Sequence, residues 1–336
     1  MIIACAPLRF SLNGGGSDLP IFSNKFEGKV VSITLDRYVY VTVNKSFSKH
    51  FRLAYSKIEH PKNISEIKHP IIRACLEKMK INDFLEITSI ADIPSNGSGL
   101  GSSSAFTVAL LKALHEYVGL QIDPPSLAKL ACEIEIEYCK EPIGRQDQWA
   151  SAVGGLNYFK FRGSDVEPEK IFSNSKDLDF AITELNRHLS FFHLPNARSA
   201  SQILKAQGAK MSESDIGFTL TMQLVELAEK SVEALKQFDF VELGRMLTKG
   251  WTIKSQLNDD YEQPYIRDLL ERLKSPGIYG GKLLGAGSGG FIAVLTNPTH
   301  KNQINSLFHD LDKVDFETKN VVPQIIKIGR SEYNRT

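Results

Sequence analysis

A loop rich in glycine and serine precedes a helical pattern and offers the clearest chemistry in the sequence. It runs Ile93-Pro94-Ser95-Asn96-Gly97-Ser98-Gly99-Leu100-Gly101-Ser102-Ser103-Ser104-Ala105-Phe106. Its alternate glycines let the backbone approach a bound group closely, and the first turn of the following helix has N–H groups without partners inside the helix. Serine hydroxyls at the helix start can donate to phosphate oxygens or offer an oxygen to Mg²⁺. The pattern therefore predicts an anion site whose ligand is a nucleotide polyphosphate.

A flexible linker, with Ser102 as an ordinary helix N-cap, is the alternative interpretation of this loop. It is disfavoured because a linker is rarely placed between a strand-like run and a strong helical pattern. Two common phosphate loops are excluded. No lysine follows the last glycine, as a Walker A loop requires, and the spacing Gly97-x-Gly99-x-Gly101 is not G-x-G-x-x-G.

Two carboxylates further along the chain are candidates for catalysis and metal binding. Asp147, in the segment 144–149, is either a helix N-cap or the group that accepts or orients the proton of an acceptor hydroxyl. Glu135 borders the apolar stripe of a helix expected over 126–139, where it is either solvated or a ligand of Mg²⁺. The residue types alone leave these alternatives open.

A triple glycine near the N-terminus lies between a cation and a carboxylate. Arg9 precedes and Asp18 follows the turn Asn13-Gly14-Gly15-Gly16-Ser17. This segment is either a floppy turn or a place where close backbone, a cation and a carboxylate hold hydroxyl and phosphate groups of a sugar phosphate.

Two segments in the second half of the chain also qualify as anion sites. Arg198 and Ser199 open a predicted helix, which either holds the phosphate of a sugar or is a helix cap with a solvated arginine. The run Gly285-Ala286-Gly287-Ser288-Gly289-Gly290 satisfies the dinucleotide fingerprint. A strand-like run at 291–295 follows it where a helix is required, so a Rossmann site is rejected.

The hydrophobic pattern places these segments among strands and helices. Strands are expected at 2–12, 29–43, 51–58, 84–90, 156–161, 188–194, 277–284, 291–295 and 321–328, and helices at 64–80, 103–118, 126–139, 215–238, 240–257, 264–274 and 300–312. The apolar face of the helix at 103–118 fixes the phosphate loop to the core. A polar, turn-rich stretch at 163–179 predicts a domain boundary, with domains at 1–175 and 176–336.

Composition excludes several classes of protein. The 336 residues, 42% of them apolar, suit two domains with sizeable cores. A net charge of +1, from 40 basic and 39 acidic residues, argues against binding to nucleic acid or a membrane surface through bulk charge. The four cysteines are scattered without a C-x-x-C pair, and no run of about eighteen apolar residues occurs. We therefore expect a cytoplasmic protein without a disulfide scaffold, a thiolate zinc site or a membrane span.

Three segments resemble the motifs of one kinase superfamily, that of galactokinase, homoserine kinase, mevalonate kinase and phosphomevalonate kinase. The segment 99–105 resembles its central motif, 7–18 its first and 282–291 its third, with Leu284 in place of a threonine that is common in mevalonate-type members. Galactokinases have Glu-His where this chain has Gly15-Gly16, which argues against galactose. The triple glycine followed by Ser-Asp-Leu-Pro resembles the heptose-phosphate kinase branch, with the kinase domain of fucokinase as a cousin.

This resemblance implies an α+β fold of two domains. The N-terminal domain has a left-handed βαβ unit around the phosphate loop, and the C-terminal domain is a ferredoxin-like arrangement of helices on an antiparallel sheet. The implied cofactors are ATP and Mg²⁺. The implied partner is a small-molecule sugar phosphate, without nucleic acid or membrane, and a homodimer is left open.

The resemblance also assigns site residues. Asp147 and Arg9 are catalytic, and Ser103 and Glu135 bind the metal. ATP is bound by Pro94, Asn96, Gly97, Ser98, Gly99, Leu100, Gly101, Ser102, Ser103 and Ser104. The sugar phosphate is bound by Gly14, Gly15, Gly16, Ser17, Asp18, Arg198, Gly287, Ser288 and Gly289.

The reaction implied is phosphorylation of the anomeric hydroxyl of a sugar 7-phosphate, with D-glycero-D-manno-heptose 7-phosphate as first choice and the 1,7-bisphosphate as product. Two alternatives stay open at this stage. One is a kinase for another sugar, such as fucose or an N-acetylhexosamine. The other is a catalytically silent sugar sensor on the same scaffold.

Overall fold

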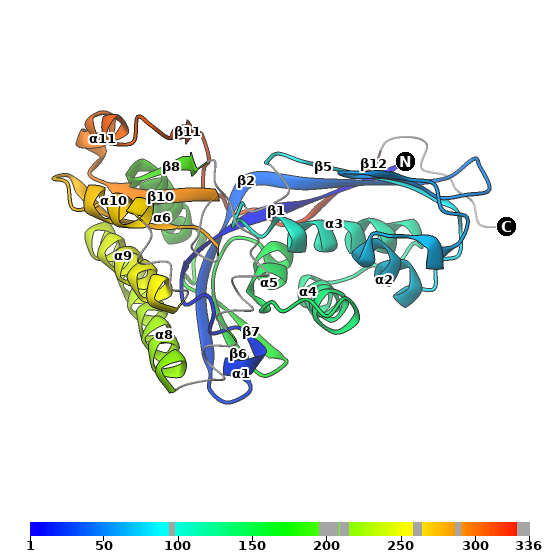
Figure 1. Ribbon diagram of the computed structural model, residues 1–336, viewed down its shortest axis with the longest axis horizontal. Helices are drawn as coiled ribbons and strands as arrows, with labels where there is room; N and C mark the ends of the chain where they lie inside the picture. Colours follow the sequence, from blue (N-terminus) through cyan, green and yellow to red (C-terminus); the bar gives the residue numbers. More distant parts are fainter. Residues whose placement is uncertain (94–97, 195–207, 209–214, 258–263, 286–289, 328–336) are drawn as a thin grey trace.

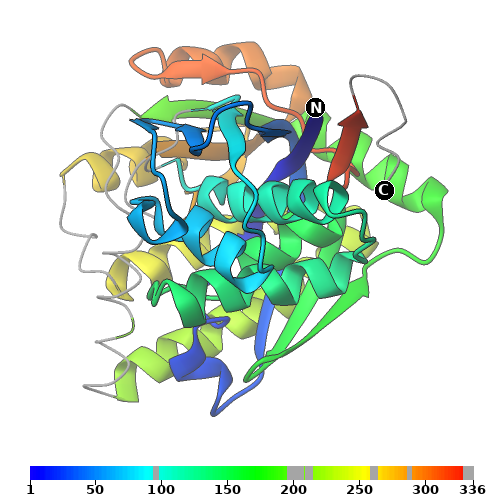
Figure 2. The ribbon, with the colours of Figure 1, turned by 90° about the vertical axis from the view of Figure 1, so that its right-hand side faces the viewer.

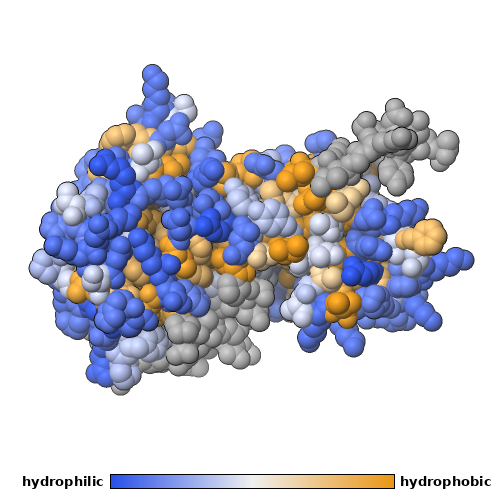
Figure 3. Space-filling view, turned by 90° about the horizontal axis from the view of Figure 1, so that it is seen from above, coloured by the Kyte–Doolittle hydropathy of each residue, from blue (hydrophilic) through white to orange (hydrophobic). Residues whose placement is uncertain are grey.

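The computed structural model describes residues 1–93, 98–194, 208, 215–257, 264–285 and 290–327. These residues form two lobes (Figure 1). The first lobe is one large sheet with helices beneath it, and the second is a four-stranded sheet packed against long helices. Seen from above, polar side chains dominate the outer parts of both lobes, and hydrophobic side chains gather toward the middle of the molecule (Figure 3).

The sheet of the first lobe has eight strands in the order β12-β1-β2-β5-β3-β4, with β6 and β7 continuing from β2. Their bounds are β1 Ile2–Asn13, β2 Gly28–Lys45, β3 Arg52–Ala54, β4 Ile58–Glu59, β5 Leu85–Ala91, β6 Leu156–Arg162, β7 Asp165–Lys170 and β12 Gln324–Lys327. Strand β2 spans the lobe, because its first part pairs with β6 and its last part with β5. The strongest alternation in the sequence lies in this strand. Val39, Val41 and Val43 are buried, while Tyr38 and Tyr40 are half-exposed.

Helices cover one face of this sheet, with α3 next to the strands and α4 below α3, on its far side from the sheet (Figure 2). Their bounds are α1 Pro20–Ser23, α2 Pro70–Lys78, α3 Ser102–Tyr117, α4 Pro124–Cys132 and α5 Gln146–Val153, with single turns at Ile64–Glu66 (η1) and Glu133–Tyr138 (η2). Helix α3 is buried along most of its length because it packs against β1 and β2 on one side and α4 and α5 on the other. Strands β3 and β5 run parallel and are joined through α2. The implied left-handed crossover of such a unit stays a prediction.

The second lobe has the strand order β11-β8-β10-β9, with every pair antiparallel. Its strands are β8 Leu189–Leu194, β9 Ile278–Leu283, β10 Gly290–Thr296 and β11 Asp312–Val314, and its helices are α6 Ser175–His188, α8 Asp215–Lys236, α9 Phe240–Leu257, α10 Pro264–Arg272, α11 Lys301–Leu307 and the single turn η4 Pro298–His300. Helices α8, α9 and α10 connect the first strand to the second, and α11 connects the third to the fourth. This order confirms the ferredoxin-like prediction.

The predicted domain boundary meets two features that the sequence did not indicate. The polar, turn-rich stretch 163–179 contains β7 and the start of α6. Strand β7 escaped prediction because its residues are polar and include Pro168, which an edge strand tolerates. The predicted second domain of 176–336 also includes β12, which pairs with β1 and therefore belongs to the sheet of the first lobe.

One hydrophobic cluster extends from the first lobe into the second. Phe10 of β1 meets Phe191 of β8 edge to face, with ring centroids 5.6 Å apart. Buried residues of α8 and α9, such as Val232 and Leu247, belong to the same cluster as the β1 side chains. Because apolar packing crosses the boundary, the ends of β1, α5, α9 and β9 are held in fixed positions around it.

Candidate functional site

The predicted phosphate loop meets the predicted third motif where the lobes join. Gly99 and Gly285 both have positive φ, at +70° and +67°. A Cβ added to Gly99 would lie 2.6 Å from the carbonyl oxygen of Leu284, and one added to Gly285 would lie 2.4 Å from Cα of Gly99. Glycine is therefore required at both positions by conformation and by space.

Helix α3 begins immediately after this contact. Gly101, at φ +75°, is the residue before the helix, so Ser102 is the first helical residue and not the N-cap. Leu100 is buried and anchors the loop, and its carbonyl oxygen accepts a hydrogen bond from the backbone N–H of Arg9 at 3.1 Å. The N-terminal end of this sixteen-residue helix therefore lies at the boundary between the lobes. The dipole of the helix favours an anion at that end.

Arg9 and Asp147 form a close ion pair beside this helix end. Arg9 lies within β1, directly after a shift in the pairing of β1 with β2, and it is 4% exposed. Its Nε and Nη2 lie 2.8 Å and 2.7 Å from the same Asp147 oxygen, Oδ1, while Nη1 donates to the Gly99 carbonyl at 2.7 Å. Among the described residues, no hydrogen bond is made to Oδ2 of Asp147. The pair is therefore rigid and keeps one carboxylate oxygen available to a ligand.

Asp18 is held by a second set of hydrogen bonds. The backbone N–H of Gly16 donates to Oδ1 at 2.9 Å, and Gln146 donates to Oδ1 through its side chain and to Oδ2 through its backbone, both at 3.0 Å. Desolvation of this buried carboxyl raises its pKa above the ordinary value, and the two backbone donors oppose that rise. The first motif and the start of α5 are therefore fixed to one another.

Glu135 is fully buried in a ring of donors. It lies on η2, a π-helical turn that continues α4, and π-turns occur often at functional sites. Ser103 and Thr107 donate to Oε1 at 3.2 Å and 2.9 Å, Ser104 donates to Oε2 at 2.8 Å, and Gln148 also donates to Oε2. The sequence predicted that Glu135 borders the apolar stripe of its helix, but the structure buries this residue completely.

Burial dominates the electrostatics of Glu135. Desolvation raises its pKa from 4.5 to about 7, although hydrogen bonds from Ser104, Gln148 and Thr107 oppose the rise. Among the described residues, no three His, Cys, Asp or Glu side chains are grouped as a metal site. One carboxylate beside serine hydroxyls is instead a set of hard oxygen donors, which suits Mg²⁺ because this ion takes its other ligands from phosphates and water.

Two buried lysines of the second lobe reach the same region, and sequence reasoning missed both. Lys254 lies in the last turn of α9 and donates to the Gly285 carbonyl at 3.1 Å. Lys282 of β9 donates to the carbonyls of Ser11 and Leu12, both at 2.9 Å. Burial lowers the pKa of Lys254 to about 8 and that of Lys282 well below its ordinary value. Lys254 lies outside the three motif segments, and Lys282 is the first residue of the segment 282–291 but was given no role there.

The structure thus brings together most of the predicted site residues. Those placed around the junction of the lobes are Arg9, Gly14, Gly15, Gly16, Ser17, Asp18, Ser98, Gly99, Leu100, Gly101, Ser102, Ser103, Ser104, Glu135 and Asp147. Outside the described residues lie Pro94, Asn96, Gly97, Arg198, Gly287, Ser288 and Gly289.

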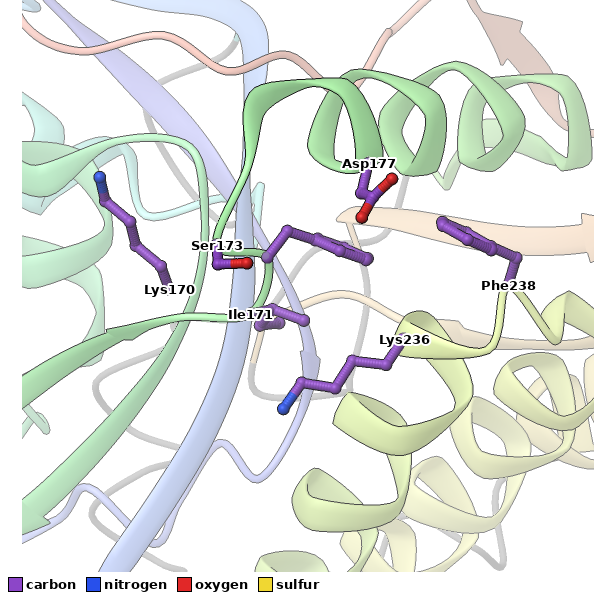
Figure 4. Close-up of a pocket in the computed structure, with 7 residues that line it drawn as sticks. Lys170, Ile171, Ser173, Asp177, Lys236 and Phe238 are labelled. Atoms are coloured by element: carbon purple, nitrogen blue, oxygen red, sulfur yellow. The ribbon is translucent and has the colours of Figure 1, made fainter.

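A separate hollow lies between the β7–α6 connection and the turn between α8 and α9 (Figure 4). Phe172 and Phe238 stack there with ring centroids 5.8 Å apart, and Lys170, Lys236 and Asp177 line its edge. None of its lining residues belongs to the predicted site.

Within the described residues, no helix combines the length and apolar content needed to cross a bilayer.

Two family models match the chain. The model described as GHMP kinases N terminal domain matches residues 66–155, and the one described as GHMP kinases C terminal matches residues 231–309. The first match contains the phosphate loop, Glu135 and Asp147, and the second contains Lys254 and Lys282. The letters GHMP denote the superfamily that the three sequence motifs resemble.

Comparisons with individual proteins agree with these matches. A curated relative, the D-glycero-alpha-D-manno-heptose 7-phosphate kinase of Campylobacter jejuni, is 29% identical over 318 residues, which cover 90% of this chain and 91% of that protein. A crystal structure described as a D-glycero-D-manno-heptose 1-phosphate kinase from Bacteroides thetaiotaomicron superposes with a TM-score of 0.78 at 23% identity, covering 98% of this chain and all of that one. Galactokinase of Lactococcus lactis superposes with a TM-score of 0.73 at 14% identity, covering 96% of this chain and 95% of that one. The structural matches confirm the two-domain fold. The names of the two heptose kinases differ, because one gives a 7-phosphate and the other a 1-phosphate.

Proposed function

Because the chain belongs to the GHMP kinases, we propose that it transfers the γ-phosphoryl group of ATP to the anomeric hydroxyl of a sugar 7-phosphate. The acceptor proposed is D-glycero-D-manno-heptose 7-phosphate, and the product is the 1,7-bisphosphate. The single observation that carries this proposal is the Arg9–Asp147 pair at the N-terminal end of α3. The heptose 7-phosphate kinase of C. jejuni, similar over nine-tenths of both chains, supports the choice of acceptor.

The phosphate donor binds at the loop before α3. Backbone N–H groups of the first helical turn would meet an anion there, and the helix dipole favours negative charge. The contact between Gly99 and Leu284 brings the second lobe against this loop. The donor phosphates are thereby held at the junction, beside the ion pair.

The acceptor hydroxyl is placed by Asp147. Arg9 binds Oδ1 twice, so Oδ2 is the oxygen that accepts a hydrogen bond from the hydroxyl and orients its oxygen toward the γ-phosphorus. In a loose phosphoryl-transfer transition state this orientation matters more than early proton removal. Asp147 takes the proton as the new bond forms, and Arg9 keeps its carboxylate in place and adds positive charge close to the transferred group.

Ser103 and Glu135 are the residues that would hold Mg²⁺. When bound, this ion neutralises charge on the nucleotide phosphates. Glu135 is suited to the role because it is a buried carboxylate whose hydrogen bonds come from hydroxyl and amide groups and whose charge no basic side chain neutralises within the described residues. Thr107 and Gln148 orient the carboxylate from behind.

A panel of sugars and sugar phosphates, incubated with ATP and Mg²⁺ and assayed for ADP release, tests the proposed function. Heptose 7-phosphate is expected to give the highest kcat/KM. Fucose, an N-acetylhexosamine and galactose are the comparison acceptors, and a preference for one of them would replace the proposed acceptor. Absence of ADP release with every sugar would favour a silent sensor.

A further inference from the structure

The side of Gly15 that faces the second lobe carries polar atoms that no assigned role uses. A Cβ added to Gly15 would lie 3.0 Å and 3.2 Å from the amide nitrogen and oxygen of Gln146, and 3.3 Å from Nζ of Lys254. Gly15 does not have a positive φ, so its backbone conformation does not demand glycine. The absence of a Cβ instead lets the Gln146 amide and the Lys254 ammonium group approach the same piece of backbone.

The polar atoms gathered beside Gly15 are incompletely hydrogen-bonded. Oε1 of Gln146 is buried and has no partner among the described residues. Lys254 is 6% exposed, and within the described part of the chain its ammonium group donates to one acceptor, the Gly285 carbonyl. An ammonium group has three N–H donors, and a buried polar atom without a partner is costly. Both groups are therefore prepared for a ligand.

The charged groups near Lys254 favour a ligand hydroxyl group over a ligand phosphate group at this position. Asp18 and Asp147 face Lys254 from the first lobe, and Arg9 adds a cation that is already paired with Asp147. A ligand oxygen that reaches these two side chains meets a donor, Nζ of Lys254, and an acceptor, Oε1 of Gln146. A sugar hydroxyl satisfies both at once because it accepts and donates, whereas a phosphate oxygen would leave the acceptor unpaired.

We propose that Lys254 and Gln146 bind one hydroxyl group of the acceptor sugar over Gly15, next to Asp18. This inference rests on the proposed function and adds a substrate-binding residue from α9 of the second lobe. It makes Lys254 a determinant of acceptor affinity, separate from the ion pair that serves the transferred group.

Calorimetry with a nonhydrolysable ATP analogue and Mg²⁺ present tests the inference on the full chain. Heptose 7-phosphate is one probe, and D-mannose, which shares the manno ring hydroxyls and has no phosphate, is the other. Lys254→Met is expected to weaken binding of both probes about 10- to 100-fold, which is the loss of one hydrogen bond to a charged group. Lys249→Met, an exposed lysine of the same helix, is the matched control and is expected to bind as the wild type does.

A second variant separates binding from folding. Gly15→Ala places a methyl group 3.0–3.3 Å from the Gln146 amide and Lys254 Nζ without a positive-φ penalty, so both side chains must shift. It is expected to weaken both probes while leaving affinity for the ATP analogue unchanged, which shows that the variant is folded. Equal affinities in wild type and Lys254→Met overturn the inference alone. If Lys254→Met loses affinity for heptose 7-phosphate but not for D-mannose, Lys254 binds the phosphate of the sugar, and the assignment to a hydroxyl group is overturned. If the wild type binds neither probe, the inference fails together with the proposed acceptor.

Discussion

The buried carboxyl of Glu135 predicts how stability depends on pH in metal-free protein. Its pKa is about 7 in the folded state against an ordinary value of 4.5. A group whose folded pKa is raised contributes stability that is fully present below the unfolded pKa and is lost as pH rises through the folded pKa. The shift corresponds to about 3 kcal/mol, most of it lost between pH 5 and pH 8. Glu135 should therefore make the protein less stable at pH 8 than at pH 5.

Glu135→Gln removes the titrating group and keeps the shape of the side chain. The surroundings can adapt, because hydroxyl groups accept as well as donate and Oε1 of Gln148 is free to accept among the described residues. Urea unfolding in EDTA at several pH values gives the free energies. Between pH 4.5 and pH 8, the free energy of unfolding of the variant is expected to rise by about 3 kcal/mol relative to that of the wild type.

The exposed neighbour Glu137 provides the control. Glu137→Gln is expected to follow the wild-type pH dependence, because an exposed carboxylate stays solvated in both states. Parallel curves for wild type and Glu135→Gln would refute the reasoning, since they would mean that Glu135 is charged at no cost in the folded protein.

Three further predictions concern catalysis and the junction. Asp147→Asn should lower kcat by about 10²- to 10⁴-fold while ATP affinity, measured by calorimetry, stays the same; an active variant would remove Asp147 from the mechanism. Gly99→Ala should cost about 1–3 kcal/mol of stability and weaken ATP binding, because the new Cβ would be strained and would meet Leu284. Gly163→Ala, with similar φ in a surface turn and no close contact, is its control and should leave ATP affinity unchanged. The KM for the acceptor should rise above pH 8 as Lys254 loses its proton, and this rise should be absent in Lys254→Met.

The elements were predictable where local patterns are strong. The alternation in β2 and the long apolar face of α3 come directly from the order of the side chains. The ends of helices were less predictable. The helix expected over 126–139 divides into α4 and a π-turn, and Glu135 is buried on that turn and not at a border. Strand β7 is polar and pairs at an edge, so its sequence has no strand signal.

The site was predictable where a motif carries it. Arg9 and Asp18 stand in the segment that resembles the first family motif, the resemblance also assigns Asp147, and folding brings these residues together. Lys254 and Lys282 lie on a helix and a strand of the second lobe, outside or at the edge of any motif, and they reach the site through contacts with residues far away in the chain. Such contacts follow from the packing of the lobes, which local sequence does not reveal.

The most direct test of the account is ³¹P NMR of a reaction containing the protein, ATP, Mg²⁺ and D-glycero-D-manno-heptose 7-phosphate. The account predicts loss of the γ-phosphate resonance and growth of a phosphate resonance coupled to the anomeric proton, while the 7-phosphate resonance is retained. A new phosphate on any other carbon, or ATP that stays intact, would contradict it.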